Sequence, residues 1–204
     1  MGITISTALA FALTSLLIEL TPGPNMTYLA LVGVRAGRRA GYAATLGVAL
    51  GLGLVGLATA LGLSALITAS PMIYAILRWV GVAYLTYLAW EAWRESGRSD
   101  DVPIQTDGRF FVRGLITNLL NPKAAAFYVA VLPTFLDPGH PPSGQALALS
   151  IIYVLVASAV HATIVTMASF LRPLLANKRV RAAAGKVFAV ALACVALWLA
   201  WSTR

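Results

Sequence analysis

The chain has 204 residues, of which 59% are hydrophobic and only 11% are charged, and its mean hydropathy is +0.82. Soluble globular proteins carry about a quarter charged residues, so this composition excludes a water-soluble domain and indicates an integral membrane protein. The formal net charge of +8 would suggest a nucleic-acid partner in a soluble protein. In a membrane protein, the placement of the charges decides what they mean.

Long uncharged stretches predict six transmembrane helices, because a helix crosses about 30 Å of hydrocarbon in roughly 20 residues. The stretch 40–77 has no charge and is too long for one span, and Thr68-Ala69-Ser70-Pro71 predicts the turn inside it. Alternating hydrophobicity of the barrel-strand type is absent. The predicted helices are Ile3–Val34, Gly41–Ile67, Met72–Trp93, Val112–Leu136, Gln145–Leu171 and Ala182–Trp201.

The basic residues predict the orientation in the membrane. The connections after the first, third and fifth predicted helices hold eleven Lys and Arg residues, whereas the opposite side holds only Arg204. Connections rich in Lys and Arg stay in the cytoplasm, so both termini are expected outside it. The positive charge is thus assigned to topology and to the lipid bilayer, and no nucleic-acid partner is expected. The eleven residues are Arg35, Arg38, Arg39, Arg94, Arg98, Arg109, Arg113, Arg172, Lys178, Arg179 and Arg181.

The two halves of the chain show weak similarity to each other at an offset of 100 residues. Leu20-Thr21-Pro22 aligns with Leu120-Asn121-Pro122, and Tyr28 aligns with Tyr128. In both copies the proline interrupts the first helix of a three-helix group. Because three is an odd number, the second copy must enter the membrane from the opposite face, which is the arrangement of many secondary transporters.

These features predict the fold class: an all-α integral membrane protein whose six transmembrane helices form two inverted three-helix repeats, with helices one and four broken. We expect one membrane domain over 1–204. The first repeat covers 1–94 and the second covers 112–204. The polar stretch 95–111 between them is expected to be a cytoplasmic linker.

The break in the first helix predicts a binding site. Pro22 and Pro24 have no N–H to donate, and Gly23 between them adds backbone freedom. Backbone groups freed in this way must be satisfied by protein, water or ligand inside a membrane, so such a segment belongs against a bundle interior or a wet cavity. From Asn25 onward, the N–H groups form the positive end of a half-helix, which suits a carboxylate.

Asn121-Pro122-Lys123 repeats this arrangement in the fourth helix, where Pro122 frees the carbonyl of Asn118 and Lys123 adds a full positive charge. An amphoteric substrate would bind its carboxylate at these helix starts and its amino group on freed carbonyls or on Glu19. One kinked helix is more often structural, but two in corresponding halves favour a substrate pathway. The candidate substrate residues are Glu19, Pro22, Gly23, Pro24, Asn25, Asn118, Asn121, Pro122 and Lys123.

Three further features have two interpretations each. Glu19 is ionisable within the membrane and is a functional candidate, or it pairs structurally with Lys123 or with an arginine on the cytoplasmic side. His161 could relay protons, or it could be a buried histidine bonded to a neighbouring carbonyl. The small residues Ala43, Gly47 and Gly51 indicate close helix packing, either within one protomer or in a homodimer.

Four segments carry a family resemblance: Leu20–Asn25, Gly37–Gly41, Arg78–Leu85 continuing to Trp90, and Asn118–Ala124. With these motifs, spaced over nearly the whole chain, the sequence resembles the LysE/RhtB family of amino-acid exporters. The resemblance implies export of amino acids or close derivatives across a bacterial inner membrane, driven by the proton motive force. In such a membrane, the charge asymmetry described above predicts that both termini lie in the periplasm. Some relatives carry an acidic residue in the middle of the fifth helix, where this chain has Ala157 and, one turn later, His161. The resemblance therefore implies no proton-coupling role for this helix.

Two other classes of protein serve as alternatives. A membrane-embedded enzyme would need paired carboxylates or a His/Asp cluster, but Asp100, Asp101 and Asp107 lie in the polar linker with no histidine near. A passive channel is disfavoured because paired broken helices indicate a gated central site. We therefore expect a carrier for a small amphoteric substrate and protons, with no enzymatic activity, cofactor or metal; the single Cys194 offers no metal cluster.

Overall fold

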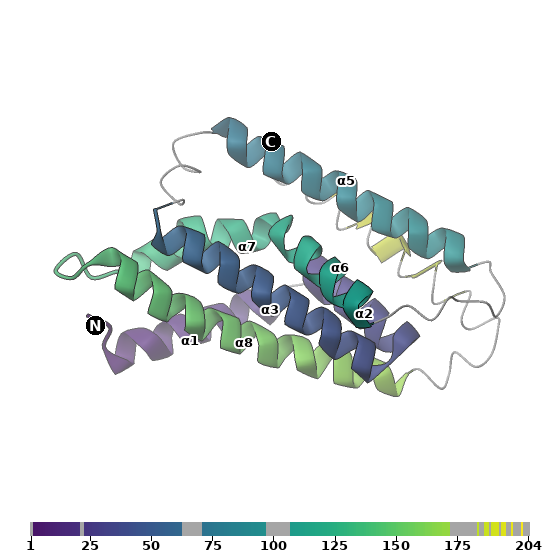
Figure 1. Cartoon of the computed structure of the whole chain (residues 1–204), viewed down its shortest axis with the longest axis horizontal. Helices are drawn as coiled ribbons and strands as arrows, with labels where there is room; N and C mark the ends of the chain where they lie inside the picture. The colour runs from purple at the N-terminus through teal and green to yellow at the C-terminus, as the bar shows by residue number, and fades with distance from the viewer. Residues whose placement is uncertain are drawn as a thin grey trace.

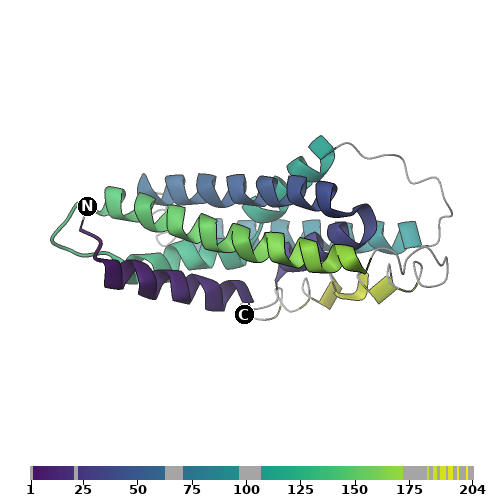
Figure 2. The ribbon, with the colours of Figure 1, turned by 90° about the horizontal axis from the view of Figure 1, so that it is seen from below.

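The computed structural model describes residues 2–20, 23–62, 71–96 and 107–171, together with residues 183, 186–187, 189–191, 193–194, 197 and 201. Every regular element in these ranges is a helix, which confirms the all-α prediction. The helices form an elongated bundle, in which α3 (Arg38–Ala60) and α8 (Pro142–Phe170) lie side by side (Figure 1). Figure 2 shows the same bundle from below, with α1 (Ile5–Leu20) beside α8.

The first predicted transmembrane helix is divided into α1 and α2 (Pro24–Ala36), whose axes differ by 63°. This bend confirms the predicted break; Thr21 and Pro22 lie outside the described residues. Gly23 precedes α2 in extended conformation, and Pro24 is the first helical residue. A proline is well placed there, because the N–H of that position has no partner within the helix.

The fourth predicted helix is broken in the same manner. It comprises α6 (Asp107–Leu119), α7 (Pro122–Ala126), a π-helical turn η1 (Phe127–Val131) and a 3₁₀ turn η2 (Leu132–Phe135), and its two halves are bent by 50°. The side chain of Asn121 caps the start of α7 by accepting a hydrogen bond of 3.0 Å from the Lys123 amide. The π-helical turn was not predicted; such turns occur often near functional sites.

Several helix ends differ from the predicted ones. α6 begins at Asp107, five residues before Val112, and α5 (Pro71–Ser96) ends three residues after Trp93. The predicted linker 95–111 is therefore helical at both ends. An aspartate in the first turn favours a helix start, since it complements the positive end of the helix dipole, and Asp107 also binds Arg39 of α3 (2.6 Å). The predicted turn at 68–70 lies outside the described residues.

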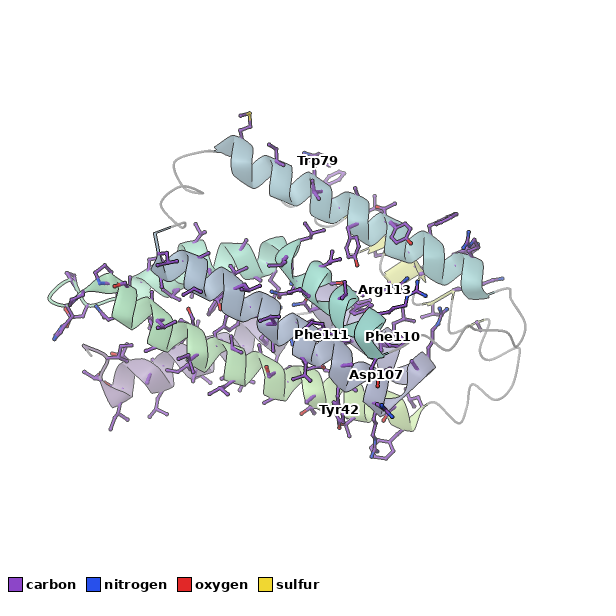
Figure 3. All side chains as sticks on the ribbon, viewed as in Figure 1. Tyr42, Trp79, Asp107, Phe110, Phe111 and Arg113 are labelled. Carbon is purple, nitrogen blue, oxygen red and sulfur yellow. The ribbon has the colours of Figure 1, made fainter. Side chains whose placement is uncertain are left out.

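The described helices support a multi-pass membrane protein. By length and composition, α3 and α8 can each cross a membrane, and each bent pair can form one more span, which allows up to four spans among the residues that were searched. The predicted helix Met72–Trp93 corresponds to α5, which lies along the outside of the bundle with Trp79 on its exposed side (Figure 3). The predicted helix Ala182–Trp201 lies largely outside the described residues, so the six-helix inverted repeat stays a prediction.

Glycines bring α3 and α6 into backbone contact. A Cβ added to Gly47 would collide with the carbonyl oxygen of Phe111, and one added to Gly114 would collide with that of Ala44. Figure 3 shows the first turns of α6, with Asp107 and Phe111, against α3. Gly47 and Gly51 of the small-residue row thus pack within one protomer. Ala43, the first member of the row, is only partly buried, whereas its neighbour Ala44 is buried.

Candidate functional site at the two helix breaks

Glu19 is the buried acid among the side chains that the structure describes. It lies in the last turn of α1 with only 4% of its surface exposed. The Tyr153 hydroxyl donates a hydrogen bond of 2.7 Å to Oε1, and His161 Nε2 lies 3.1 Å from Oε2. The two atoms of the His161 contact are close enough for an ion pair, but their geometry is not that of a hydrogen bond. Among the described residues, Nε2 has no hydrogen-bond partner. Both carboxylate oxygens therefore contact α8, which compensates part of the cost of burying a charge.

Lys123 brings the opposite charge to the same region from the other broken helix. It is the second residue of α7 and is partly buried. The charges of Lys123 and Glu19 are close enough to attract each other. The two predicted charged residues of the site thus lie within electrostatic range of each other, although 104 positions separate them in the sequence.

A direct hydrogen bond joins the two broken helices. Asn25 Nδ2, in the first turn of α2, donates to Asn118 Oδ1, in the last turn of α6, over 2.9 Å. The side chains are deeply buried, with 4% and 1% of the two residues exposed. Asn118 fits there because Gly51 of α3 has no side chain; an added Cβ would lie 2.8 Å from Asn118 Nδ2.

Aromatic side chains enclose the buried polar groups. The rings of Phe127 and Tyr153 lie 4.1 Å apart between centroids, and those of Tyr128 and Tyr153 lie 5.4 Å apart. The Tyr128 hydroxyl donates to the Leu52 carbonyl oxygen over 2.9 Å. All three aromatic residues are essentially inaccessible. They shield the site from lipid, and in such an environment charges interact more strongly than in water.

Comparison with known proteins identifies the family. A family model described as LysE type translocator matches residues 16–203, a range that includes both breaks and α8. The chain belongs to the LysE type translocator family. No solved structure matches this translocator.

Named relatives of this translocator are efflux proteins. The homoserine/homoserine lactone efflux protein of Salmonella typhimurium (strain LT2) is 33% identical over 162 residues, covering 78% of this chain and 79% of the relative. The leucine efflux protein of Salmonella choleraesuis is 33% identical over 134 residues, covering 64% and 63%. An uncharacterized membrane protein of Pseudomonas aeruginosa is 32% identical over 157 residues, covering 72% and 73%. The resemblance to exporters drawn from the sequence motifs is confirmed at the level of the family.

Most predicted site residues of the translocator gather at the breaks. Glu19 meets His161, Asn25 meets Asn118, and Asn121 caps the helix that carries Lys123. Their roles in transport stay predictions. Gly23, Pro24 and Pro122 shape the backbone of the breaks, while Pro22 lies outside the described residues.

Sequence reasoning missed Tyr153 and Phe127. Tyr153 could have been found, since Tyr153, Ala157 and His161 are spaced by four residues and form one face of α8; all three are buried. Phe127 offered no such signal, because its place depends on the π-helical turn. Among the described residues, no group of three His, Cys, Asp or Glu side chains could hold a metal ion.

Proposed function

We propose that this translocator is a secondary transporter that exports amino acids or close derivatives from the cytoplasm across a bacterial inner membrane, driven by the proton motive force. The observation that carries the proposal is the meeting of buried charged and amide groups at the joint between two broken helices. Broken helices with a site between them are typical of secondary transporters. The efflux relatives named for homoserine and leucine support the amino-acid class of substrate.

Lys123 is the group proposed to bind the substrate carboxylate. A lysine at the centre of a membrane helix is unfavourable by about 2.5–3.5 kcal/mol on insertion scales, so an anionic partner is expected for it. Lys123 directly follows Pro122 at the start of α7, and its charge and that of Glu19 attract each other. A substrate carboxylate bound at this break would therefore face a full positive charge at the joint between the two half-helices.

Glu19 and His161 are proposed to carry the coupled proton. They form a buried acid–base pair, and the other titratable groups near Glu19 are Tyr153, Tyr128 and Lys123. A proton on the pair adds one positive charge close to the ammonium group of a bound amino acid. Binding of the proton then weakens binding of the substrate, and the reverse. An exporter that exchanges its substrate for inward-moving protons requires this mutual weakening.

The test is transport by the purified protein in proteoliposomes. With a pH gradient directed as in the cell, labelled L-homoserine and L-leucine should move against their gradients, with a rate that saturates. Dissipating the pH gradient should abolish this accumulation. A non-saturating flux that ignores the gradient would indicate a channel, a chemically changed substrate would indicate an enzyme, and either result would overturn the proposal.

A further inference from the structure

The Asn25–Asn118 pair has unused hydrogen-bonding capacity. Two side-chain amides can form two hydrogen bonds with each other, but these two form one, from Asn25 Nδ2 to Asn118 Oδ1. Asn25 Oδ1 and Asn118 Nδ2 have no hydrogen-bond partner among the described residues, and both atoms are buried. If both side-chain amides are turned by 180°, one hydrogen bond still joins them, and one carbonyl oxygen and one amide nitrogen are still left without a partner.

Buried polar groups in proteins nearly always have a partner, so a donor and an acceptor left over side by side indicate a ligand that supplies both. Gly51 admits Asn118 to this position at the α3–α6 contact, where any larger residue would collide with it. The position of the amide is thus specified by the helix packing.

We propose that the Asn25–Asn118 pair recognises the α-amino group and the carbonyl oxygen of an amino-acid-like substrate. Asn25 Oδ1 accepts a hydrogen bond from the ammonium group, and Asn118 Nδ2 donates one to the carboxyl or ester oxygen. This inference rests on the proposed function, because it specifies how the same site selects its substrate class.

The asparagine pair and Lys123 should therefore recognise different chemical groups of a substrate. The neutral Asn118 amide can donate to a free carboxylate or to the carbonyl of an ester, whereas the Lys123 ammonium favours the full charge of a carboxylate. A substrate without a free carboxylate, such as a lactone, still offers an amine and a carbonyl to the asparagines. The asparagine pair recognises the amino-acid head group, and Lys123 adds a preference for its ionised form.

The experiment measures equilibrium binding of L-homoserine, L-homoserine lactone and N-acetyl-L-homoserine to the full chain purified in detergent. In the wild-type protein, homoserine and its lactone should bind and the N-acetyl compound should bind at least tenfold more weakly, because it lacks the ammonium group. In Asn25→Ala/Asn118→Ala, homoserine and lactone should both bind roughly tenfold to a hundredfold more weakly, as expected for loss of hydrogen bonds to a charged ligand. Lys123→Met should weaken homoserine more than lactone.

Ser15→Ala is the matched control, since it also removes a buried polar group, and its hydroxyl is bonded only within its own helix, to Phe11. It should bind both compounds as the wild type does. If the double alanine variant does not fold, Asn118→Asp replaces it: the bond from Asn25 to Oδ1 is retained, the unused amide donor is lost and a negative charge is added. Homoserine binding should then fall at least tenfold, and more than lactone binding, because the lactone has no carboxylate for the new charge to repel.

Two failures can be told apart. Wild-type protein that neither binds nor transports homoserine or leucine would overturn the proposed function. Alternatively, the wild-type protein binds these compounds, and a folded asparagine variant binds them with an affinity within twofold of wild type. That result would overturn only the role of the asparagine pair.

Discussion

Glu19 is held by groups from two other parts of the chain. Tyr153 and His161 contact its two carboxylate oxygens, and the charge of Lys123 attracts it from α7. An ionisable residue within a membrane usually has either a fixed partner or a role in transport. Variants that remove one charge or both separate these two roles.

Lys123→Met and Glu19→Gln should be made separately and together, with abundance and export measured for each. If Lys123 binds the substrate carboxylate, Lys123→Met should insert normally and export poorly, with the largest loss for substrates that have a free carboxylate. The double variant should not recover export. Recovery of both abundance and export in the neutral double variant would instead show a purely structural pair.

Tyr153→Phe tests the hydrogen bond to Glu19. The change removes the hydroxyl donor and retains the ring that packs on Phe127, so the protein should insert normally. A single bond to a charged group is worth about 1.5–3 kcal/mol, and we expect export to fall at least tenfold with an altered pH dependence. Tyr42→Phe is the control, because the Tyr42 hydroxyl bonds to Thr166 at an exposed position and should be dispensable. Equal export by both variants would contradict the role of Tyr153.

The breaks in helices one and four place Asn25 beside Asn118. In Pro22→Ala/Pro24→Ala, the lost N–H groups are restored and a continuous helix becomes possible. We expect this variant to insert and to lose export, because straightening the 63° bend would separate the two asparagines. Pro122→Ala should do comparable harm at the 50° bend. Transport near the wild-type level would show that the breaks serve shape alone.

The contact between α3 and α6 holds Asn118 in place, and two glycines of α3 test it. Gly47→Ala would place a methyl group against the backbone carbonyl of Phe111, which cannot rotate away. Overpacking of this kind costs about 1–3 kcal/mol, so the melting temperature in detergent should fall. Gly53→Ala is the matched control on the same helix, since nothing lies within 4 Å of its added Cβ. An unchanged melting temperature for Gly47→Ala would contradict the close packing.

The whole molecule has two chemically different ends. At one end, Arg39 binds Asp107, and Arg38 contacts Ser169 and Phe170. At the other end, Gly2 packs against His140 in the connection between η2 and α8 (Figure 1). Arg38 and Arg39 therefore lie at the end opposite the start of the chain; the side of the membrane that each end faces stays a prediction from the charge asymmetry.

This separation predicts the response to a membrane-impermeant thiol reagent in intact cells. In a Cys194→Ser background, Ser143→Cys at the start of α8 should be labelled from outside, whereas Arg109→Cys at the start of α6 should react only after the cells are permeabilised. Both positions are exposed, so access to the residue itself does not differ. Labelling of position 109 from outside would reverse the predicted orientation.

Local chemistry accounts for the part of this protein that its sequence predicts. Hydrophobic composition requires a membrane, prolines without an N–H break helices wherever they stand, and basic connections select the cytoplasmic side. Asn25, Asn118 and Lys123 could be named as site residues because each lies next to a break. These properties depend on neighbours along the chain and need no knowledge of packing.

The contacts between helices were decided by the tertiary structure. Tyr153 reaches Glu19 across 134 positions, and Asn25 reaches Asn118 across 93. Such meetings depend on how closely two helices approach and at what angle, which is set here by Gly47 and Gly114 at the α3–α6 contact and by the bends themselves. Helical periodicity shows which residues share a face, but it does not show which other helix that face will meet.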